Sequence, residues 1–121
     1  MKHDDLIRRL CEASEGNAEL SSKTWEALTG DAHFVHHDED VGFVVMRRGE
    51  DTYFSVPCLT TDLSAAWRAA KARSKGFSVD TDGKSVSVFL EWDANGRLVD
   101  MYGKHEACTL CAALLAAEGE R

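Results

Sequence analysis

The chain has 121 residues, of which 44% are hydrophobic and 29% are charged, and it contains a single proline. This composition excludes an intrinsically disordered protein, and the length predicts one domain over residues 1–121 with its own hydrophobic core. The formal net charge of −7 opposes contact with a phosphate backbone, so we expect no general nucleic-acid-binding function.

The N-terminal segment and the cysteine content indicate the compartment. The segment MKHDDLIRRLCEAS mixes charged and apolar residues where a secretory signal needs an uninterrupted apolar run, and no run in the chain is long enough to cross a bilayer. Four cysteines are too few for a secreted disulfide scaffold of this size. We therefore expect a cytoplasmic protein whose cysteines remain thiols.

Two helices are predicted in the N-terminal part. Asp4 or Asp5 can cap a first helix, and Gly16 can close it. A second helix is predicted over about residues 18–29, with Gly30 at its end. We expect these helices to form a hairpin.

The next part of the chain begins with a polar segment and continues with two segments typical of β-strands. Residues 31–40, DAHFVHHDED, are rich in histidine and acidic residues, and we expect an exposed loop there. Residues 41–46 and 52–56 are apolar runs separated by a polar stretch with one glycine. They predict a pair of strands joined by a turn.

The stretch from Pro57 to Gly76 carries the clearest helix signals, and we predict that it forms the central helix. Thr60 or Thr61 can cap its start, and Gly76 can end it. Four apolar residues recur at helical spacing and are expected to be buried: Leu63, Ala66, Trp67 and Ala70. Trp67 is expected to be a core anchor rather than a ligand-stacking residue.

The C-terminal half predicts three strands, at residues 77–80, 85–92 and 97–102. Asp82-Gly83 and Asn95-Gly96 are tight-turn pairs that join them. In the middle strand, alternate residues are apolar and are expected on one buried face: Val86, Val88, Leu90 and Trp92.

A closing helix is predicted over about residues 104–118. Its buried side should consist of Ala107, Leu110, Cys111 and Leu114. The resulting order is αα-ββ-α-βββ-α. It predicts an α+β fold in which four helices pack against a mostly antiparallel sheet of about five strands.

Three segments resemble the phage ABA sandwich domain family of small phage and prophage proteins. They are DDLIRRLCEASEGNAEL at residues 4–20, TTDLSAAWRAAKA at residues 60–72 and HEACTLCAALLAA at residues 105–117. All three lie in predicted helices, and together they cover 43 of the 121 residues, about a third of the chain. The resemblance implies a layered α/β/α sandwich and a phage origin, with action in a host bacterial cytoplasm.

Cys108 and Cys111, together with His105, are the first candidate site. Cysteines at positions i and i+3 lie close together on a helix, and the start of a helix acidifies a thiol, so one interpretation of this pair is a redox or metal role. Cys111 also falls on the predicted buried side of the helix, which favours apolar packing instead.

The histidine-rich segment is the second candidate. It offers nitrogen and oxygen ligands of the kind that divalent metals accept: His33, His36 and His37 with Asp31, Asp38, Glu39 and Asp40. Ligands on a loop with nothing to fix them are typical of a solvated surface, so we expect no metal site.

The third candidate is a basic cluster formed by Arg68, Lys71 and Lys75 on the polar side of the predicted central helix. It can hold a phosphate-bearing ligand, an RNA backbone or an acidic partner, or it can be a solvated helix face. An acidic surface that includes Asp38, Glu39 and Asp40 is the alternative partner site.

The chain carries no catalytic triad, glycine-rich phosphate loop or cofactor motif. We therefore expect a non-enzymatic protein without cofactor or metal that binds a host or phage protein, with inhibition of a host system as one outcome. The alternative is binding or sequestering of a small nucleotide-like ligand by the basic helix and aromatic side chains.

Overall fold

The computed structural model describes residues 3–29, 33–38, 43–48, 52–93 and 96–118. For residues 18 and 29, and for the strand residues between 33 and 57, only the backbone is described. The elements follow in the order α1 (Asp4–Glu12), α2 (Ala18–Thr29), β1 (His33–Asp38), β2 (Phe43–Arg48), β3 (Thr52–Pro57), α3 (Leu63–Arg73), β4 (Ser74–Thr81), β5 (Val86–Trp92), β6 (Leu98–Gly103) and α4 (Glu106–Glu118).

The described strands form two separate antiparallel sheets, β1-β2-β3 and β4-β5-β6. The α+β class and the four helices are confirmed, whereas the single sheet of about five strands is wrong. The predicted order of elements, αα-ββ-α-βββ-α, omitted one strand. That strand is β1, which occupies residues 33–38 of the expected loop.

Strand β1 pairs with β2 through the backbone, with Asp38 opposite Phe43 and His33 opposite Arg47. A ladder of backbone hydrogen bonds does not require apolar side chains, so a histidine-rich segment can form a strand once a neighbour supplies the partner groups. The register shifts between Phe34 and His36, which interrupts the alternation that a sequence pattern would show.

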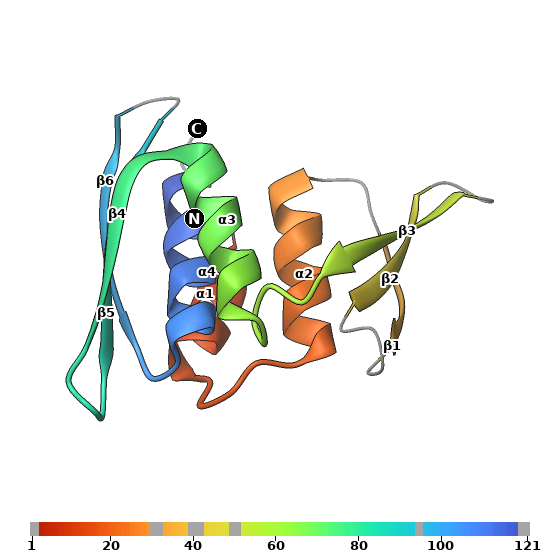
Figure 1. The fold of residues 1–121 in the computed structure, drawn as a ribbon, viewed down its shortest axis with the longest axis horizontal. Coiled ribbons are helices and arrows are strands. Elements are labelled where there is room, and N and C mark those ends of the chain that lie inside the picture. The colour runs from red at the N-terminus through yellow and green to blue at the C-terminus, as the bar shows by residue number, and fades with distance from the viewer. Residues whose placement is uncertain (1–2, 30–32, 39–42, 49–51, 94–95, 119–121) are drawn as a thin grey trace.

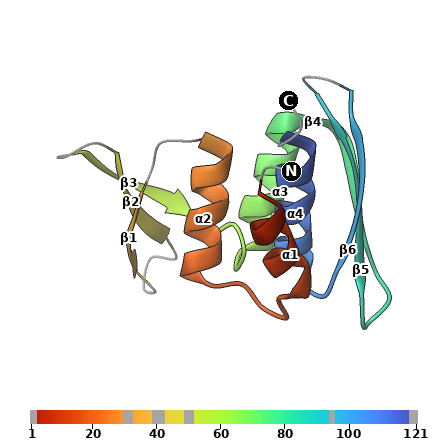
Figure 2. The ribbon, with the colours of Figure 1, turned by 180° about the vertical axis from the view of Figure 1, so that it is seen from behind.

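The helices lie between the two sheets. Figure 1 shows α1, α3 and α4 on one face of β4-β5-β6, with α2 next to them and β1-β2-β3 beyond α2. The view from behind shows the same arrangement, and α2 makes the main helix contacts to β1 and β2 (Figure 2). This order of layers differs from the expected α/β/α sandwich, in which helices would cover both faces of one sheet.

Helix α4, not α3, is the centre of the fold. It contacts the three other helices and all three strands of β4-β5-β6. Every side chain from Ala107 to Leu115 is buried, because the sequence ACTLCAALL is apolar or small on all sides. The predicted one-sided stripe was therefore too narrow. No helix in the described part of the chain has the length and apolarity to span a bilayer.

Helix α3 packs on one side only, through three small buried residues: Ala65, Ala66 and Ala70. Asp62 caps its start, since Oδ1 of Asp62 accepts a hydrogen bond from the N–H of Ser64 at 3.0 Å, so neither threonine before it is the cap. The helix ends at Arg73, and β4 begins at the next residue. The predicted end at Gly76 was therefore too late.

The alternation predicted for the middle C-terminal strand is confirmed. In β5, the four alternate apolar residues Val86, Val88, Leu90 and Trp92 are buried. They face the helices, where α4 contacts β5. Their burial joins the sheet β4-β5-β6 to the helical layer through one continuous apolar core.

A buried threonine ties distant parts of the chain together. The hydroxyl of Thr60 donates to the carbonyl of Asn17 at 2.9 Å and accepts from the N–H of Asn17 at 3.1 Å. The Thr60 and Ser21 hydroxyl oxygens are 2.7 Å apart, and the N–H of Thr60 donates to Ser21 Oγ at 3.0 Å. The carbonyl of Thr60 accepts from the Cys108 thiol at 3.8 Å. The turn before α3 is thus joined to the start of α2 and to α4.

Thr60→Val should lower the free energy of unfolding by about 2–4 kcal/mol, because each buried polar group left without a partner costs about 1–3 kcal/mol. Thr61→Val is the matched control: Thr61 is exposed, and its replacement should change stability by less than about 0.5 kcal/mol. Urea denaturation of the three proteins measures the difference. Equal loss in both variants would show that the hydrogen bonds of Thr60 are not what stabilises this turn.

Candidate functional site

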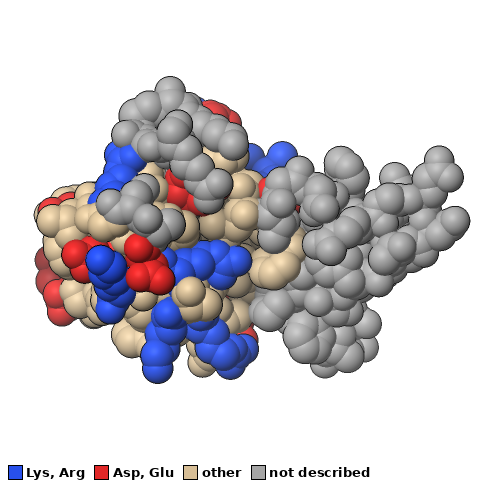
Figure 3. Space-filling view, turned by 90° about the horizontal axis from the view of Figure 1, so that it is seen from above, with Lys and Arg blue, Asp and Glu red and all other residues tan. Residues whose placement is uncertain are grey.

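The basic cluster lies on the exposed side of α3 and at the start of β4. The side chains of Arg68, Lys71 and Lys75 are all exposed, and none of them forms an ion pair with any residue that the structure describes. Figure 3 views the molecule from the end where α3 passes into β4 and shows Lys and Arg side chains gathered there. The structure therefore brings the three predicted basic residues to one region of the surface.

Trp67 is not the core anchor that the sequence predicted. It is 39% exposed, and its indole ring packs edge-on with the ring of Phe77, with centroids 4.6 Å apart and an angle of 68° between the planes. Helix α3 approaches α4 through alanines, which leaves no space for an indole between the two helices. The tryptophan is therefore placed at the edge of the core, in contact with solvent.

Two hollows adjoin Trp67, one toward the end of α3 and one toward its start. The larger, of about 390 Å³, is lined by Trp67, Lys71, Ser74, Lys75, Gly76 and Phe77. The other, of about 310 Å³, is lined by Leu63, Ser64, Trp67 and Arg68. Each member of the basic cluster borders one of these hollows. Aromatic surface and positively charged side chains therefore occur together around Trp67.

A β-bulge places Lys75 at the larger hollow. Ser74 pairs with Trp92 and Gly76 pairs with Glu91, so Lys75 is the extra residue on β4. A bulge of this kind redirects a side chain that would otherwise follow the regular alternation of the strand. Lys71 on the helix and Lys75 on the strand consequently border the same hollow.

The predicted acidic site lies mostly outside the described residues. Asp38 is the last residue of β1 and pairs with Phe43, whereas Glu39 and Asp40 are not described. The side chains of the histidine-rich segment also lie outside the described part, so its metal-binding capacity stays a prediction. Among the described residues, no group of three His, Cys, Asp or Glu side chains is placed to hold a metal ion.

The outer face of β4-β5-β6 is a surface that the sequence interpretation missed. In Figure 1, none of the described helices lies on this face. It exposes Phe89 (43% exposed), Leu98 (61%) and Tyr102 (68%), and the strand register places these residues on the side opposite the buried valines of β5. Phe89 was the available signal, because it is a large apolar residue on the polar side of an otherwise regular alternation.

Carboxylates lie between these apolar side chains. Asp100 pairs with Phe89, Glu91 pairs with Leu98, and Asp80 pairs with Ser87, which in turn pairs with Tyr102. No lysine or arginine occupies an outward position on the paired segments. Those positions are Gly76, Ser78, Asp80, Ser87, Phe89, Glu91, Leu98, Asp100 and Tyr102. The outer face is therefore apolar and acidic at the same time.

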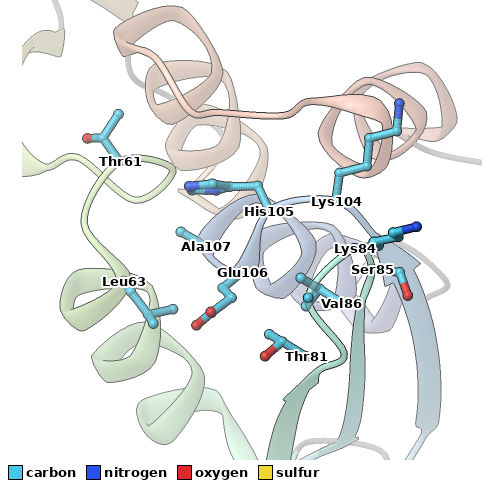
Figure 4. Close-up of a pocket in the computed structure, with 11 residues that line it drawn as sticks. Thr61, Leu63, Thr81, Lys84, Ser85, Val86, Lys104, His105, Glu106 and Ala107 are labelled. Atoms are coloured by element: carbon cyan, nitrogen blue, oxygen red, sulfur yellow. The ribbon is translucent and has the colours of Figure 1, made fainter.

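A third concave region, of about 400 Å³, lies at the start of α4 (Figure 4). His105 borders it, and Nδ1 of His105 accepts from the N–H of Cys108 at 3.3 Å, which caps the helix. Glu106 lies in the first turn of α4, where a negative charge is favourable. Figure 4 shows the side chains of Lys84 and Lys104 directed away from His105 and Glu106. The positions of His105 and Glu106 are thus accounted for by their interactions with the first turn of α4.

The cysteines of α4 are packing residues that remain protonated. Burial raises the pKa of Cys108 to about 11, with a smaller contribution from the nearby Cys11, and burial also raises the pKa of Cys111. Both thiols donate weak hydrogen bonds, Cys111 to the carbonyl of Leu59 at 3.5 Å and Cys108 to that of Thr60 at 3.8 Å. A raised pKa is the opposite of what a reactive or metal-binding thiolate needs. All four cysteines are free thiols in the structure.

In comparisons with known proteins, no family model, curated protein or solved structure matches the chain. The candidate sites therefore depend on the described residues alone.

Alkylation without reductant should modify four thiols once the protein is unfolded, and intact-mass measurement counts them. In the native protein at about pH 8, Cys11 should react first because it is only half-buried, whereas Cys108 and Cys111 should react at the rate of unfolding. The order follows from burial, which shields both α4 thiols and raises the pKa of each; burial also raises the pKa of Cys11, but this thiol is only partly shielded. Fewer than four modified thiols in the unfolded chain would reveal a disulfide, and rapid native modification of Cys108 would contradict its protonated, buried state.

Proposed function

We propose that the chain is a small phage-type accessory protein that acts by non-enzymatic binding to a host or phage protein in a bacterial cytoplasm. The outer face of β4-β5-β6 is the observation that carries the proposed binding role. The phage origin in this proposal comes from the resemblance of the three helical segments to the phage ABA sandwich domain family.

The composition of the outer face favours a protein partner. Large apolar patches on a protein surface mark interaction sites, and aromatic residues are enriched at the centres of protein interfaces. Phe89 and Tyr102 provide aromatic rings, and Leu98 adds a third apolar side chain. An open sheet face of this kind suits a broad contact better than the enclosure of a small molecule.

The carboxylates specify the chemistry of the partner. Asp80, Glu91 and Asp100 present negative charge without a lysine or arginine at the outward positions of the paired strands. A basic protein surface complements such a face, and the charges speed association more than they stabilise the complex. Basic surfaces are typical of nucleic-acid-binding proteins, so occupation of one by this face would inhibit a host system of that class.

Binding of a small nucleotide-like ligand is the alternative, and it has separate structural support. The hollows beside Trp67 border all three residues of the basic cluster. These hollows lie along α3 and at its junction with β4, and the only outward position of the outer face that lines them is Gly76. The two functions therefore use different surfaces and can be tested independently.

Leu98→Thr combined with Tyr102→Thr should lower the affinity for the partner at least tenfold, because aromatic and apolar residues at an interface centre commonly carry most of the binding energy. Threonine retains a high strand propensity, so the fold should persist. The partner is identified by affinity capture from bacterial lysate, and its dissociation constant for the wild type and the variant is then measured with purified proteins. Association with the wild type should slow as salt concentration rises.

The matched control reverses the basic cluster, with Arg68, Lys71 and Lys75 each changed to glutamate. Exposed charges contribute little to stability, so the melting temperature should remain nearly unchanged. If the outer face is the binding surface, this variant keeps full affinity for the captured protein. Loss of binding in the control with normal binding in the threonine variant would place the partner on α3 instead and would refute the proposal.

A further inference from the structure

Trp67 is exposed because α3 packs on α4 through alanines, which leave no space for an indole between the two helices. Tryptophan is highly buried on average, whereas 39% of Trp67 remains accessible to solvent. Its contact with Phe77 fixes the ring at the edge of the core, with the two centroids 4.6 Å apart. The structure thus holds an accessible indole in a defined position.

The larger hollow combines two kinds of binding group. Trp67 and Phe77 provide aromatic surface, and Lys71 and Lys75 provide two ammonium groups at the same place. These groups come from two elements, since Trp67 and Lys71 are one helical turn apart on α3 and Lys75 is the bulged residue of β4. Neither lysine is paired with a described carboxylate, so both are available to a ligand.

The geometry points to a binding site for a free nucleotide at this hollow, with the base stacked on Trp67 and the phosphates on Lys71 and Lys75. A nucleotide is the class of ligand that joins an aromatic plane to adjacent negative charge. Stacking of a base on an aromatic side chain contributes substantially to affinity and tolerates any base. Lysine is a usual phosphate ligand because its ammonium group acts as a flexible point charge.

The overall charge favours a short ligand over a nucleic-acid strand. With a net charge of −7, the body of the protein repels a long phosphate backbone as it leaves the hollow. Arg68 borders the second hollow, on the other side of Trp67, and provides the only further cation of the basic cluster. The site shares only Gly76, which has no side chain, with the outward positions of β4-β5-β6, so it does not depend on the proposed protein partner.

Calorimetric titration with ATP, adenosine and tripolyphosphate tests the site. ATP should bind most tightly, since it alone uses both the ring and the ammonium groups. Trp67→Leu should weaken the binding of ATP and of adenosine by about tenfold or more, because a leucine cannot stack. Lys71→Gln combined with Lys75→Gln should weaken ATP binding by about tenfold, reduce its salt dependence and leave adenosine binding unchanged.

Matched variants separate the site from general charge and from loss of fold. Lys23→Gln removes an exposed lysine on α2 and should bind ATP like the wild type. Trp67→Phe keeps an aromatic ring and should retain most of the affinity, so it serves if Trp67→Leu does not fold. Adenosine should also shift the indole N–H resonance of Trp67 in the NMR spectrum, which the Trp67→Phe spectrum assigns by its absence.

Several results would overturn the inference. Absence of ATP binding at millimolar concentration would do so, as would equal affinity for ATP and tripolyphosphate, or equal loss in Lys23→Gln and in the double variant Lys71→Gln with Lys75→Gln. Tighter binding of a short oligothymidylate than of ATP would assign the hollow to single strands and would also reject a free nucleotide. None of these results bears on the outer face, whose partner is measured separately.

Discussion

The buried hydroxyl of Thr60 joins the turn before α3 to Asn17 and Ser21 of the α2 segment through three hydrogen-bond contacts. It is buried where the turn before α3 meets the start of α2. In the same turn, the carbonyls of Leu59 and Thr60 accept hydrogen bonds from the thiols of Cys111 and Cys108 on α4. Asp62, two residues later, caps α3, so the position of that helix follows from the turn. A buried network of this kind stabilises only when every member is paired, which makes the turn intolerant of partial changes.

The size of the side chains on α3 decides where the candidate ligand site lies. Alanines face α4, so the two helices pack closely and the tryptophan of α3 is placed outside the contact. The same close packing of α3 on α4 places Trp67 next to Phe77 and to the lysines at the junction with β4. Core packing and the exposed aromatic site are therefore two results of one arrangement. The outer sheet face arises differently, from the lack of a described helix on that side.

Local patterns predicted the parts of the fold that depend on one strand or one helix alone. The alternation in β5 predicted its buried face, because one side of a sheet faces the core. The strand β1 was not predictable, since its pairing with β2 uses backbone groups that carry no sequence signal. The side on which Trp67 lies was not predictable either: helical spacing gives an angle around the helix, but only the neighbouring α4 decides which angle is buried. The basic cluster was found from its charges, whereas the hollows beside it required the fold.

Because β4 begins directly after α3, the number of residues at the junction between them is constrained. Arg73 ends the helix and Ser74 begins the strand, and the bulge at Lys75 already accommodates one extra residue. One more residue inserted here would shift the alternation of β4 by half a period and turn Phe77 and Val79 from the helical side to the outer side. Natural variants of this protein should therefore differ in length at the turn between β4 and β5, around Gly83, and keep the helix-to-strand junction constant.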